Sequence, residues 1–421
     1  MRLAASQTPL PSPVEAYFEV ANRCNSKCAT CPLTFSPQES ARQLSLDEFK
    51  ALVAQLPDLK RAVLQGIGEP LLNRDLSAMI AHLAQRGVYS VFNTNAALLT
   101  RRRQVELIDS GLDELRVSLD SSTPETYLKV RGIPAFERVV ANVAEMVRTR
   151  NAHGSSKPRI SIWMTALREN LRELPAIIDL AASLGVDEVY VQRLVYWGVG
   201  LATRDQSVFN AQGEVVAKDA TPASTTAANG ASAAHAVAPG PVIHSRAPEP
   251  ESSAPSQALH REVDAHALND GGMANGRAAS PTPRTADAAC HAHAEAGTTT
   301  FDPDAILLEA EQRALRHGLA FRGADARPPR SGLLEHRDEH EPWRACSRPL
   351  RLAYVTAQGT ALPCCIAPFT DAPFESIRFG NYLRDGVESV WHGEAYQRFR
   401  EQLYSSHPPA SCRNCGLAWS L

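Results

Sequence analysis

The spacing of apolar residues changes repeatedly along the first half of the chain. From Val14 to about Trp197, short apolar runs alternate with longer stretches whose apolar residues recur at helical spacing. The expected strands are residues 15–20, 61–70 (ending in glycines), 89–95, 114–120, 159–167 and 188–197. Apolar strands that each precede a helix are typical of a parallel sheet covered by helices.

Local signals mark the ends of several helices between these strands. Ser45 and Glu48 form a predicted capping box, Gly87 closes the helix that begins at residue 76, and Pro124 stands at a first helical position. The chain holds roughly six strand–helix units of this kind. We therefore expect an α/β fold, a partial (β/α)6 TIM-like barrel that stays open rather than closing with eight units.

The pattern divides the chain into five parts. Residues 1–13 read as a polar leader, 14–210 as the barrel, and 301–341 as the end of the barrel with a linker. Residues 211–300 contain no Phe, Trp or Tyr and show no sustained period, so we expect a disordered, low-complexity insertion. Residues 342–421 read as a separate α+β module with a hairpin, a helix over 387–404 and a final cysteine pair.

Charge and hydropathy exclude some functions. The net charge of −3 does not suggest a surface for nucleic acid, and no apolar run approaches the ~20 residues that span a bilayer. We expect a cytoplasmic protein with no nucleic-acid or membrane partner. In a reducing compartment, clustered thiols ligate metal more often than they form disulfides.

Three cysteines stand together in "CNSKCATC", directly after the first expected strand. Cys24, Cys28 and Cys31 have the spacing C-x3-C-x2-C. A structural zinc site takes four ligands, whereas three thiolates on a [4Fe–4S] cluster leave one iron open to another ligand. A cluster with an open iron is the favoured interpretation, and a zinc site or a chance grouping is the alternative.

This spacing after the first strand of a βα barrel resembles the radical S-adenosylmethionine (SAM) enzymes. "GIGEP" after the second strand is similar to the family's Gly-Gly-Glu-Pro motif, and polar residues follow later strands in register, including "NTN", "SLD", "KVRG" and "QRL". The resemblance implies a [4Fe–4S] cluster on Cys24, Cys28 and Cys31. It implies SAM contacts from Gly66, Gly68, Glu69, Pro70, Asn95, Ser118, Asp120, Arg131 and Gln192.

The resemblance also implies a mechanism. SAM binds the open iron, an electron from the reduced cluster cleaves its sulfonium, and the resulting 5′-deoxyadenosyl radical abstracts hydrogen from the substrate. The electron would come from a donor such as a flavodoxin or ferredoxin. The protein's part is to position the reactants and shield the radical.

A second cysteine group lies in the C-terminal module. Cys346, Cys364, Cys412 and Cys415 supply four thiols, and C-x12-G-x4-C resembles the SPASM domain or its shortened twitch form. The resemblance implies one auxiliary [4Fe–4S] cluster, with zinc as the alternative. A cluster with four protein ligands has no open iron, so it suits acceptance of an electron from a substrate radical.

These features predict a radical SAM oxidoreductase or maturase. The expected reaction is a two-electron oxidation or maturation of a peptide or a small hydroxylated metabolite. The alternatives are a methyltransferase or carbon–carbon bond-forming enzyme, and a non-catalytic iron–sulfur scaffold. Cys365 is a candidate hydrogen donor or base, although a small buried filler is the commoner role for such a residue. Cys290 lies in the insertion beside histidines that could bind stray metal.

Overall fold

A computed structural model describes residues 10–195, 198–203, 205–208, 301–323, 329, 343, 346–413 and 415. The expectations for most of the leader, for the 211–300 insertion and for Cys290 lie outside the described residues. The described parts of 1–219 and 300–421 form one compact unit. None of the described helices is long and apolar enough to cross a membrane.

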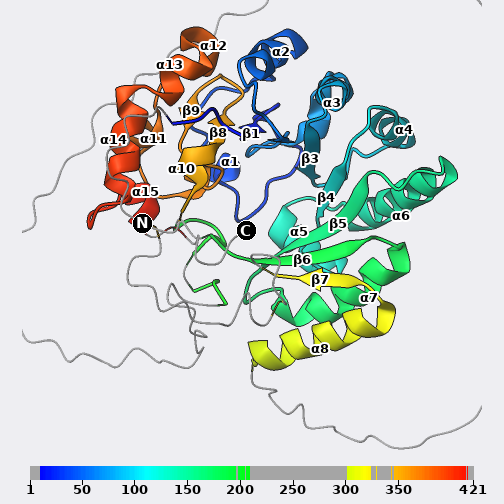
Figure 1. Cartoon of the computed structure of the whole chain (residues 1–421). Coiled ribbons are helices and arrows are strands. Elements are labelled where there is room, and N and C mark those ends of the chain that lie inside the picture. Colours follow the sequence, from blue (N-terminus) through cyan, green and yellow to red (C-terminus); the bar gives the residue numbers. More distant parts are fainter. Residues whose placement is uncertain are drawn as a thin grey trace, which may run out of the picture. The chain divides into compact units, whose positions relative to one another are not determined.

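Nine strands form a single open sheet whose order is β7-β6-β5-β4-β3-β2-β1-β8-β9 (Figure 1). Neighbours from β7 to β8 are parallel, and β9 runs antiparallel to β8. The strands are β1 (Glu15–Phe18), β2 (Arg61–Val63), β3 (Tyr89–Thr94), β4 (Glu114–Ser118), β5 (Arg159–Ala166), β6 (Glu188–Arg193), β7 (Ala320–Arg322), β8 (Leu352–Val355) and β9 (Ala361–Leu362). The predicted partial barrel is confirmed.

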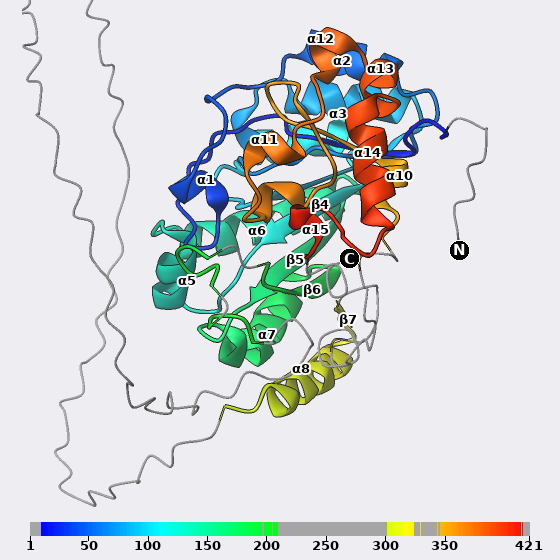
Figure 2. The ribbon, with the colours of Figure 1, turned by 90° about the vertical axis from the view of Figure 1, so that its left-hand side faces the viewer.

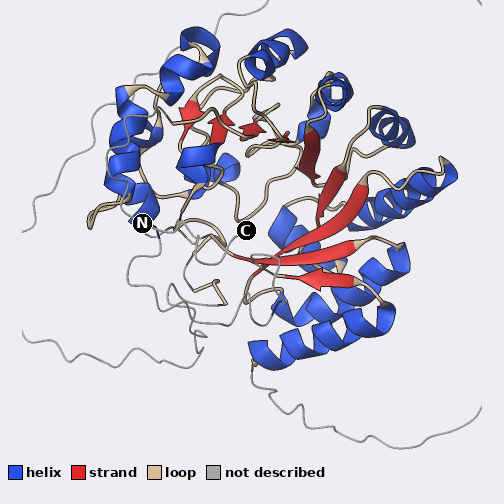
Figure 3. Ribbon diagram, in the orientation of Figure 1, coloured by secondary structure: helices blue, strands red, loops and turns tan. Residues whose placement is uncertain are grey.

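Helices cover the outer face of this sheet, as Figure 3 shows. They are α2 (Leu46–Ala54), α3 (Leu76–Gln85), α4 (Arg101–Asp109), α6 (Phe136–Ala152), α7 (Leu174–Leu184) and α8 (Pro303–His317). The shorter α5 (Pro124–Arg131) lies inside this row of helices in Figure 1. The expected capping box at the start of α2 is present, with Ser45 and Glu48 bonded reciprocally.

Alternation along each strand divides the apolar side chains between two clusters. On β1, Ala16 and Phe18 join the main core under the helices, where Phe18 packs edge-on against Phe49 of α2. Tyr17 points to the opposite face and joins a smaller cluster with Val63 and residues of the C-terminal part. Burial of such side chains, roughly 1.5–3 kcal/mol for each large one, ties that part to the inside of the sheet.

The C-terminal part extends the barrel sheet. The predicted hairpin is present as β8 and β9, and β8 pairs along the whole of β1 from Glu15↔Leu352 to Phe18↔Val355. The short helices of this part are α10 (Arg348–Arg351) before β8, then α11 (Phe374–Ile377), α12 (Tyr382–Asp385), α13 (Val387–Trp391), α14 (Glu394–Leu403) and α15 (Ala410–Arg413). In Figure 2, α12 and α13 lie beside α2, consistent with the hydrogen bond from Val387 N to Gln55 Oε1 at 2.9 Å.

One expected helix is divided in two. The apolar spacing over 387–404 predicted a continuous helix, but α13 ends at Trp391 and α14 begins at Glu394. Gly393 between them has extended backbone angles, and an added Cβ there would lie 2.9 Å from the carbonyl oxygen of Ser389. The chain therefore turns at Gly393, and α14 takes its own direction.

Candidate functional site

A cavity of about 760 Å³ opens at the carboxyl ends of the parallel strands. This is the edge at which side chains from different strands of an α/β barrel converge. Its lining includes Cys24, Cys28 and Cys31 and every predicted SAM-contacting residue except Pro70, namely Gly66, Gly68, Glu69, Asn95, Ser118, Asp120, Arg131 and Gln192. Pro70 is instead buried at the start of a short 3₁₀ helix, η1 (Pro70–Leu72).

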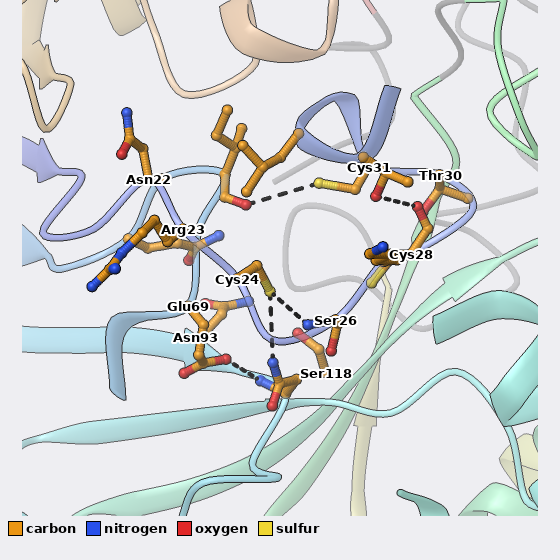
Figure 4. Close-up of a pocket in the computed structure, with 18 of the residues that line it drawn as sticks. Asn22, Arg23, Cys24, Ser26, Cys28, Thr30, Cys31, Glu69, Asn93 and Ser118 are labelled. Carbon is orange, nitrogen blue, oxygen red and sulfur yellow. Dashed lines mark hydrogen bonds between the residues drawn. The ribbon is translucent and has the colours of Figure 1, made fainter. Parts of the chain in front are cut away.

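The cysteine loop connects β1 to the one-turn helix α1 (Pro32–Phe35) and is held from two sides. Ala29 donates its N–H to the carbonyl of Val130 at 2.9 Å and accepts from the N–H of Leu201 at 2.6 Å. Figure 4 shows the sulfur atoms of Cys24, Cys28 and Cys31 facing one open space inside the cavity. The loop thus presents three thiols to the cavity from a tethered backbone.

Hydrogen-bond donors reach two of these sulfurs. Cys24 Sγ accepts from Ser26 N at 3.3 Å and from Asn95 Nδ2 at 3.8 Å, and Arg131 Nη1 lies 3.8 Å from Cys28 Sγ. Donors and positive charge near a sulfur favour the thiolate, which is the form that binds metal. Cys31 differs, since its thiol lies 3.8 Å from the carbonyl oxygen of Ile67.

Burial opposes ionisation of these thiols. Together with the neighbouring thiols, it raises the pKa of Cys24 to about 11 and that of Cys31 to about 12. Such thiols bind iron only with release of their protons. Among the described residues, no three Cys, His, Asp or Glu side chains are arranged around a single metal ion. The open triangle of thiols suits a larger cluster, because a cubane distributes its irons among the thiolates.

The "GIGEP" loop after β2 owes its shape to Glu69, whose side chain is almost fully buried. Its carboxylate accepts hydrogen bonds from Thr94 Oγ1 at 2.7 Å, Leu71 N at 3.0 Å and Asn95 N at 2.8 Å. Both oxygens of Glu69 are therefore occupied, and the carboxylate joins the ends of β2 and β3. Gly68 packs so closely against the cysteine loop that a Cβ would lie 2.1 Å from the carbonyl oxygen of Ala21.

Asp120 and Arg131 form a buried ion pair in the cavity wall. Arg131 Nη2 lies 2.7 Å from Asp120 Oδ2, and Asp120 Oδ1 accepts from Thr165 N at 2.8 Å. Burial alone would lower the pKa of Arg131, but the adjacent Asp120 carboxylate outweighs it and the pKa lies above its ordinary value. The pair fixes a guanidinium between β4 and the cysteine loop.

Three buried polar atoms in the lining have no hydrogen-bond partner among the described residues. They are Ser26 Oγ, Asn93 Oδ1 and Arg131 Nε. Buried polar groups are normally satisfied, so unpaired atoms around one cavity are a sign of a polar ligand. Two donors and an acceptor of this kind fit a nucleoside that carries an amino-acid group, as SAM does.

The sequence interpretation missed part of the lining. Trp163 on β5 is buried in the wall with its indole Nε1 donating to Ser161 Oγ at 2.9 Å. Its ring lies between Arg116, whose guanidinium carbon is 4.1 Å from the ring centroid, and Tyr190, whose ring centroid is 4.0 Å away. Thr165, which accepts from Gln192 Nε2 at 3.0 Å, and Phe369 also line the cavity. Trp163 and Thr165 occupy alternate positions of β5, a period-two signal that could have identified them.

The C-terminal cysteines act on one another's ionisation. Burial raises the pKa of the Cys364 thiol well above its ordinary value, and neighbouring Cys365, Cys415 and Cys412 act in the same sense. Burial, Cys415 and Cys346 act in the same sense on Cys412, whose pKa is raised to about 12. Cys365 acts in the same sense on Cys346 and Cys364, so these effects involve all five C-terminal thiols.

The glycine of the C-x12-G-x4-C element has a structural role. Gly359 lies in the turn between β8 and β9 with φ of +84°, and an added Cβ would meet Asn381 and Leu383 at 2.8 Å. Only glycine adopts this backbone without strain. The tight turn returns the chain along β9 so that Cys364 follows its end.

Cys365, the predicted catalytic candidate, is placed differently from the cavity cysteines. It packs with Cys364 against the apolar cluster that contains Tyr17, Val63 and Tyr354. It is not among the described residues that line the cavity. Its role, as a filler or as a hydrogen donor or base, stays a prediction.

Comparisons with known proteins agree with this geometry. A family model of the radical SAM superfamily matches residues 18–181, and a model of the SPASM iron–sulfur cluster-binding domain matches residues 346–416. The chain is 29% identical over 195 residues to a PqqA peptide cyclase of Bradyrhizobium diazoefficiens, 46% of this chain and 49% of that protein. It is 30% identical over 187 residues to an Fe-coproporphyrin III synthase of Methanosarcina barkeri, 44% of each chain. These matches span about half the length of the curated relatives.

Two solved structures share the fold. SuiB of Streptococcus suis bound to SAM superposes with a TM-score of 0.54 and 13% identity, over 93% of this chain and 68% of that one. The enzyme anSMEcpe with bound SAM gives a TM-score of 0.53 and 12% identity, over 96% and 90% of the chains. Radical SAM domains bind a [4Fe–4S] cluster and SAM, and SPASM domains bind auxiliary iron–sulfur clusters. With its cysteine loop, strand-end cavity and C-terminal thiols, this chain belongs to the radical SAM superfamily and carries a SPASM domain.

Proposed function

We propose that this protein is an enzyme that cleaves SAM reductively and abstracts hydrogen from a substrate held in the 760 Å³ cavity. The observation that carries the proposal is the convergence of three thiols and three unpartnered polar atoms on one cavity at the strand ends. When bound, the cluster and SAM supply a 5′-deoxyadenosyl radical. The chain's own residues bind, orient and shield these groups.

Specific residues divide this work. Cys24, Cys28 and Cys31 hold the cluster, with Asn95 and Arg131 donating toward two of the sulfurs. Arg131 and Ser118 receive the SAM carboxylate, and the backbone of the Gly66–Gly68 segment receives its amino group. Arg131 suits this role because its Nε is buried and unpartnered while Asp120 orients its guanidinium. Asp120 and Gln192 face the nucleoside.

The C-terminal thiols favour a two-electron oxidation. Cys346, Cys364, Cys412 and Cys415 supply four ligands for one auxiliary [4Fe–4S] cluster, which leaves its irons without an open position. These thiols would hold a cluster that could accept the electron left on the substrate after hydrogen abstraction. The separate electron that cleaves SAM would come from a donor of the flavodoxin or ferredoxin class.

A peptide is the favoured substrate. The PqqA peptide cyclases, by their name, act on a peptide, and SuiB has been seen bound to the precursor peptide SuiA with the same fold. A small hydroxylated metabolite is the second candidate. The cavity accommodates either a side chain presented by a peptide or a small molecule beside SAM.

Bond formation without net oxidation is the alternative reaction. Several relatives are named as cyclases, including a probable GTP 3′,8-cyclase of Metallosphaera sedula that is 28% identical over 183 residues. Carbon–carbon bond formation and methyl transfer are both compatible with the same cavity. A scaffold without turnover would hold its clusters but leave SAM intact.

An anaerobic reconstitution separates these cases. The reduced, cluster-loaded protein should convert SAM to 5′-deoxyadenosine, and absence of this nucleoside would favour the scaffold. With cell extract or candidate peptides, a product two hydrogens lighter would support a two-electron oxidation, which includes the joining of two C–H carbons within one substrate. A product heavier by one CH2 unit would support methyl transfer. Cys28→Ala is the matched control, since it removes one cluster thiol and should abolish nucleoside formation.

A further inference from the structure

Glu19 joins the barrel to the C-terminal hairpin through a single buried carboxylate. It directly follows β1, and its side chain is only 2% exposed. Its Oε1 accepts from the backbone N–H of Ile67 at 2.9 Å, and its Oε2 accepts from the backbone N–H of Ala357 at 3.0 Å. Ile67 belongs to the "GIGEP" loop, and Ala357 belongs to the turn between β8 and β9.

Glu19 is in direct van der Waals contact with the "GIGEP" loop. An added Cβ at Gly66 would lie 2.2 Å from Glu19 Oε1, so the loop backbone rests directly on this carboxylate. The carbonyl of Ile67 in turn accepts from Cys31 Sγ at 3.8 Å. Glu19 therefore supports the segment that touches both the cavity and one cluster thiol.

The other end of the connection is equally direct. Glu19 N donates to Val355 O at 2.8 Å, so backbone and side chain both hold the end of β8 and its turn. The same turn contains Gly359, and the chain continues from it through β9 to Cys364. A continuous series of contacts thus runs from the auxiliary cysteines through Ala357, Glu19 and Ile67 to Cys31.

Keeping a carboxylate in this position is costly. A buried carboxylate loses its hydration, and the Glu39 carboxylate acts on Glu19 in the same unfavourable sense. Its hydrogen bonds within the described residues are those from the two backbone N–H groups of the two segments. A carboxylate with two acceptor oxygens is the one side chain of this length that accepts from both at once.

We propose that Glu19 is a positioning residue that couples the state of the auxiliary cysteine site to SAM binding at the first cluster. The proposal rests on the proposed function of the cavity. When the auxiliary site is filled, the hairpin turn is ordered and Glu19 holds the Gly66–Ile67 backbone where it meets SAM. When that site is emptied, the turn loosens and the same backbone loses its support.

The test is a double-mutant cycle on the full chain under anaerobic conditions. SAM affinity is measured from the change that SAM causes in the electron paramagnetic resonance spectrum of the reduced first cluster. The four proteins are the wild type, Glu19→Gln, Cys412→Ala and the double variant. Glutamine matches the size of Glu19 but sets an amide donor against one of the two N–H groups, so it breaks one side of the connection.

We expect each single variant to weaken SAM binding by about fivefold or more, and the double variant to be no weaker than the poorer single one. Fully additive effects would overturn the coupling. Glu114→Gln is the matched control, because Glu114 is another buried carboxylate but lies at the opposite end of β4 and pairs with Arg116. It should leave SAM affinity unchanged.

A second measurement needs no change at Glu19. Hydrogen exchange of the peptide covering residues 61–69 should be faster in Cys412→Ala than in the wild type, while the peptide covering 101–109 should exchange equally in both. Equal exchange at 61–69 would contradict the proposal even if Glu19→Gln failed to fold. A wild-type cluster that gives no spectral response to SAM would instead refute the proposed function, so the two failures are distinguishable.

Discussion

The two cysteine sites of this protein are built in opposite ways. The first takes three thiols from eight consecutive residues, in a loop tethered at Ala29. The second gathers thiols from a segment before β8, from the end of β9 and from α15. The first site leaves polar atoms of its cavity unpartnered. Burial disfavours ionisation of thiols in both sites, since it raises the pKa of Cys24 and Cys31 as well as that of Cys364 and Cys412.

The first site is therefore suited to exchange a bound ligand, whereas the second is suited to retain what it binds. A local loop at the open edge of a sheet leaves room for a ligand that enters and leaves. Thiols from distant segments that bind one metal cluster stabilise the tertiary structure that brings those segments together. The comparison predicts that damage to the first site stops SAM chemistry, while damage to the second impairs the later conversion of the substrate radical to product.

The largest expected effect is loss of the first site. Cys28→Ala removes one of three cluster thiols, so iron should fall by about four atoms per chain and 5′-deoxyadenosine formation should become undetectable. Iron analysis and nucleoside assay measure this. Cys365→Ala is the matched control, because Cys365 packs outside the cavity, and it should retain both iron and SAM cleavage. Full turnover by Cys28→Ala would contradict the proposed difference between the two sites.

Loss of the second site should uncouple SAM cleavage from product formation. Cys364→Ala is expected to lose about four iron atoms while SAM cleavage at saturating SAM continues. Product formation should fall at least tenfold because the electron acceptor is missing. The ratio of product to 5′-deoxyadenosine measures this uncoupling. An unchanged ratio would show that the auxiliary cluster takes no part in oxidation.

Glu19, which connects the two sites, should give the protein a pH-dependent stability. Burial raises the pKa of Glu19 to about 7, above the value of about 4.3 for an unfolded glutamate. The folded state therefore keeps its proton where the unfolded state has lost it, so this contribution is greatest at low pH and declines up to about pH 7. Relative to Glu19→Gln, wild-type unfolding free energy should fall by about 2 kcal/mol from pH 5.5 to 7.5. Urea unfolding measures this, and parallel curves for the two proteins would contradict it.

Arg131 should affect affinity in the first site more than chemistry. Arg131→Lys keeps the charge but loses the planar guanidinium that meets Asp120 and Cys28, so SAM affinity should fall about tenfold. Arg150→Lys is the control, since Arg150 is a buried arginine paired with Asp187 away from the cavity. A matched loss of SAM affinity in the control would show that the effect is one of stability alone.

The smallest expected effect belongs to Trp163. Trp163→Phe keeps an aromatic ring against Tyr190 but loses the hydrogen bond to Ser161 and part of the contact with Arg116. The KM for substrate should rise about threefold with little change in the rate of SAM cleavage, since the ring forms the cavity wall. Steady-state kinetics with both substrates measures the difference. A large loss of SAM cleavage would place Trp163 nearer the nucleoside.

Much of the barrel and the first site could be predicted from sequence because their signals are local. Strand and helix periods, the Ser45 capping box and the spacing of Cys24, Cys28 and Cys31 each require only a few neighbouring residues. The polar residues after successive strands then converge because parallel strands end at one edge. Among the predicted SAM contacts, Pro70 is not part of the cavity lining and is buried at the start of the 3₁₀ helix η1.

The remainder depends on contacts between distant segments. The apolar pattern predicted the β8–β9 hairpin but not its place beside β1, since edge pairing has no local signature. Glu19 reads in sequence as one polar position in an apolar strand, and its two partners become apparent only in three dimensions. The break at Gly393 was missed although the buried positions before it (Val387, Val390 and Trp391) and after it (Tyr396, Phe399 and Leu403) do not fall on one face of a continuous helix.

The pairing of β8 with β1 also bears on any attempt to dissect the molecule. β8 supplies hydrogen bonds to the whole of β1. A chain that ended before residue 346 would lack β8, so the amide and carbonyl groups along that edge of the apolar strand β1 would be unpaired. Such an unpaired edge templates self-association. A truncated protein would then precipitate for reasons unrelated to iron, and point substitutions at the thiols are the sounder way to separate the two halves.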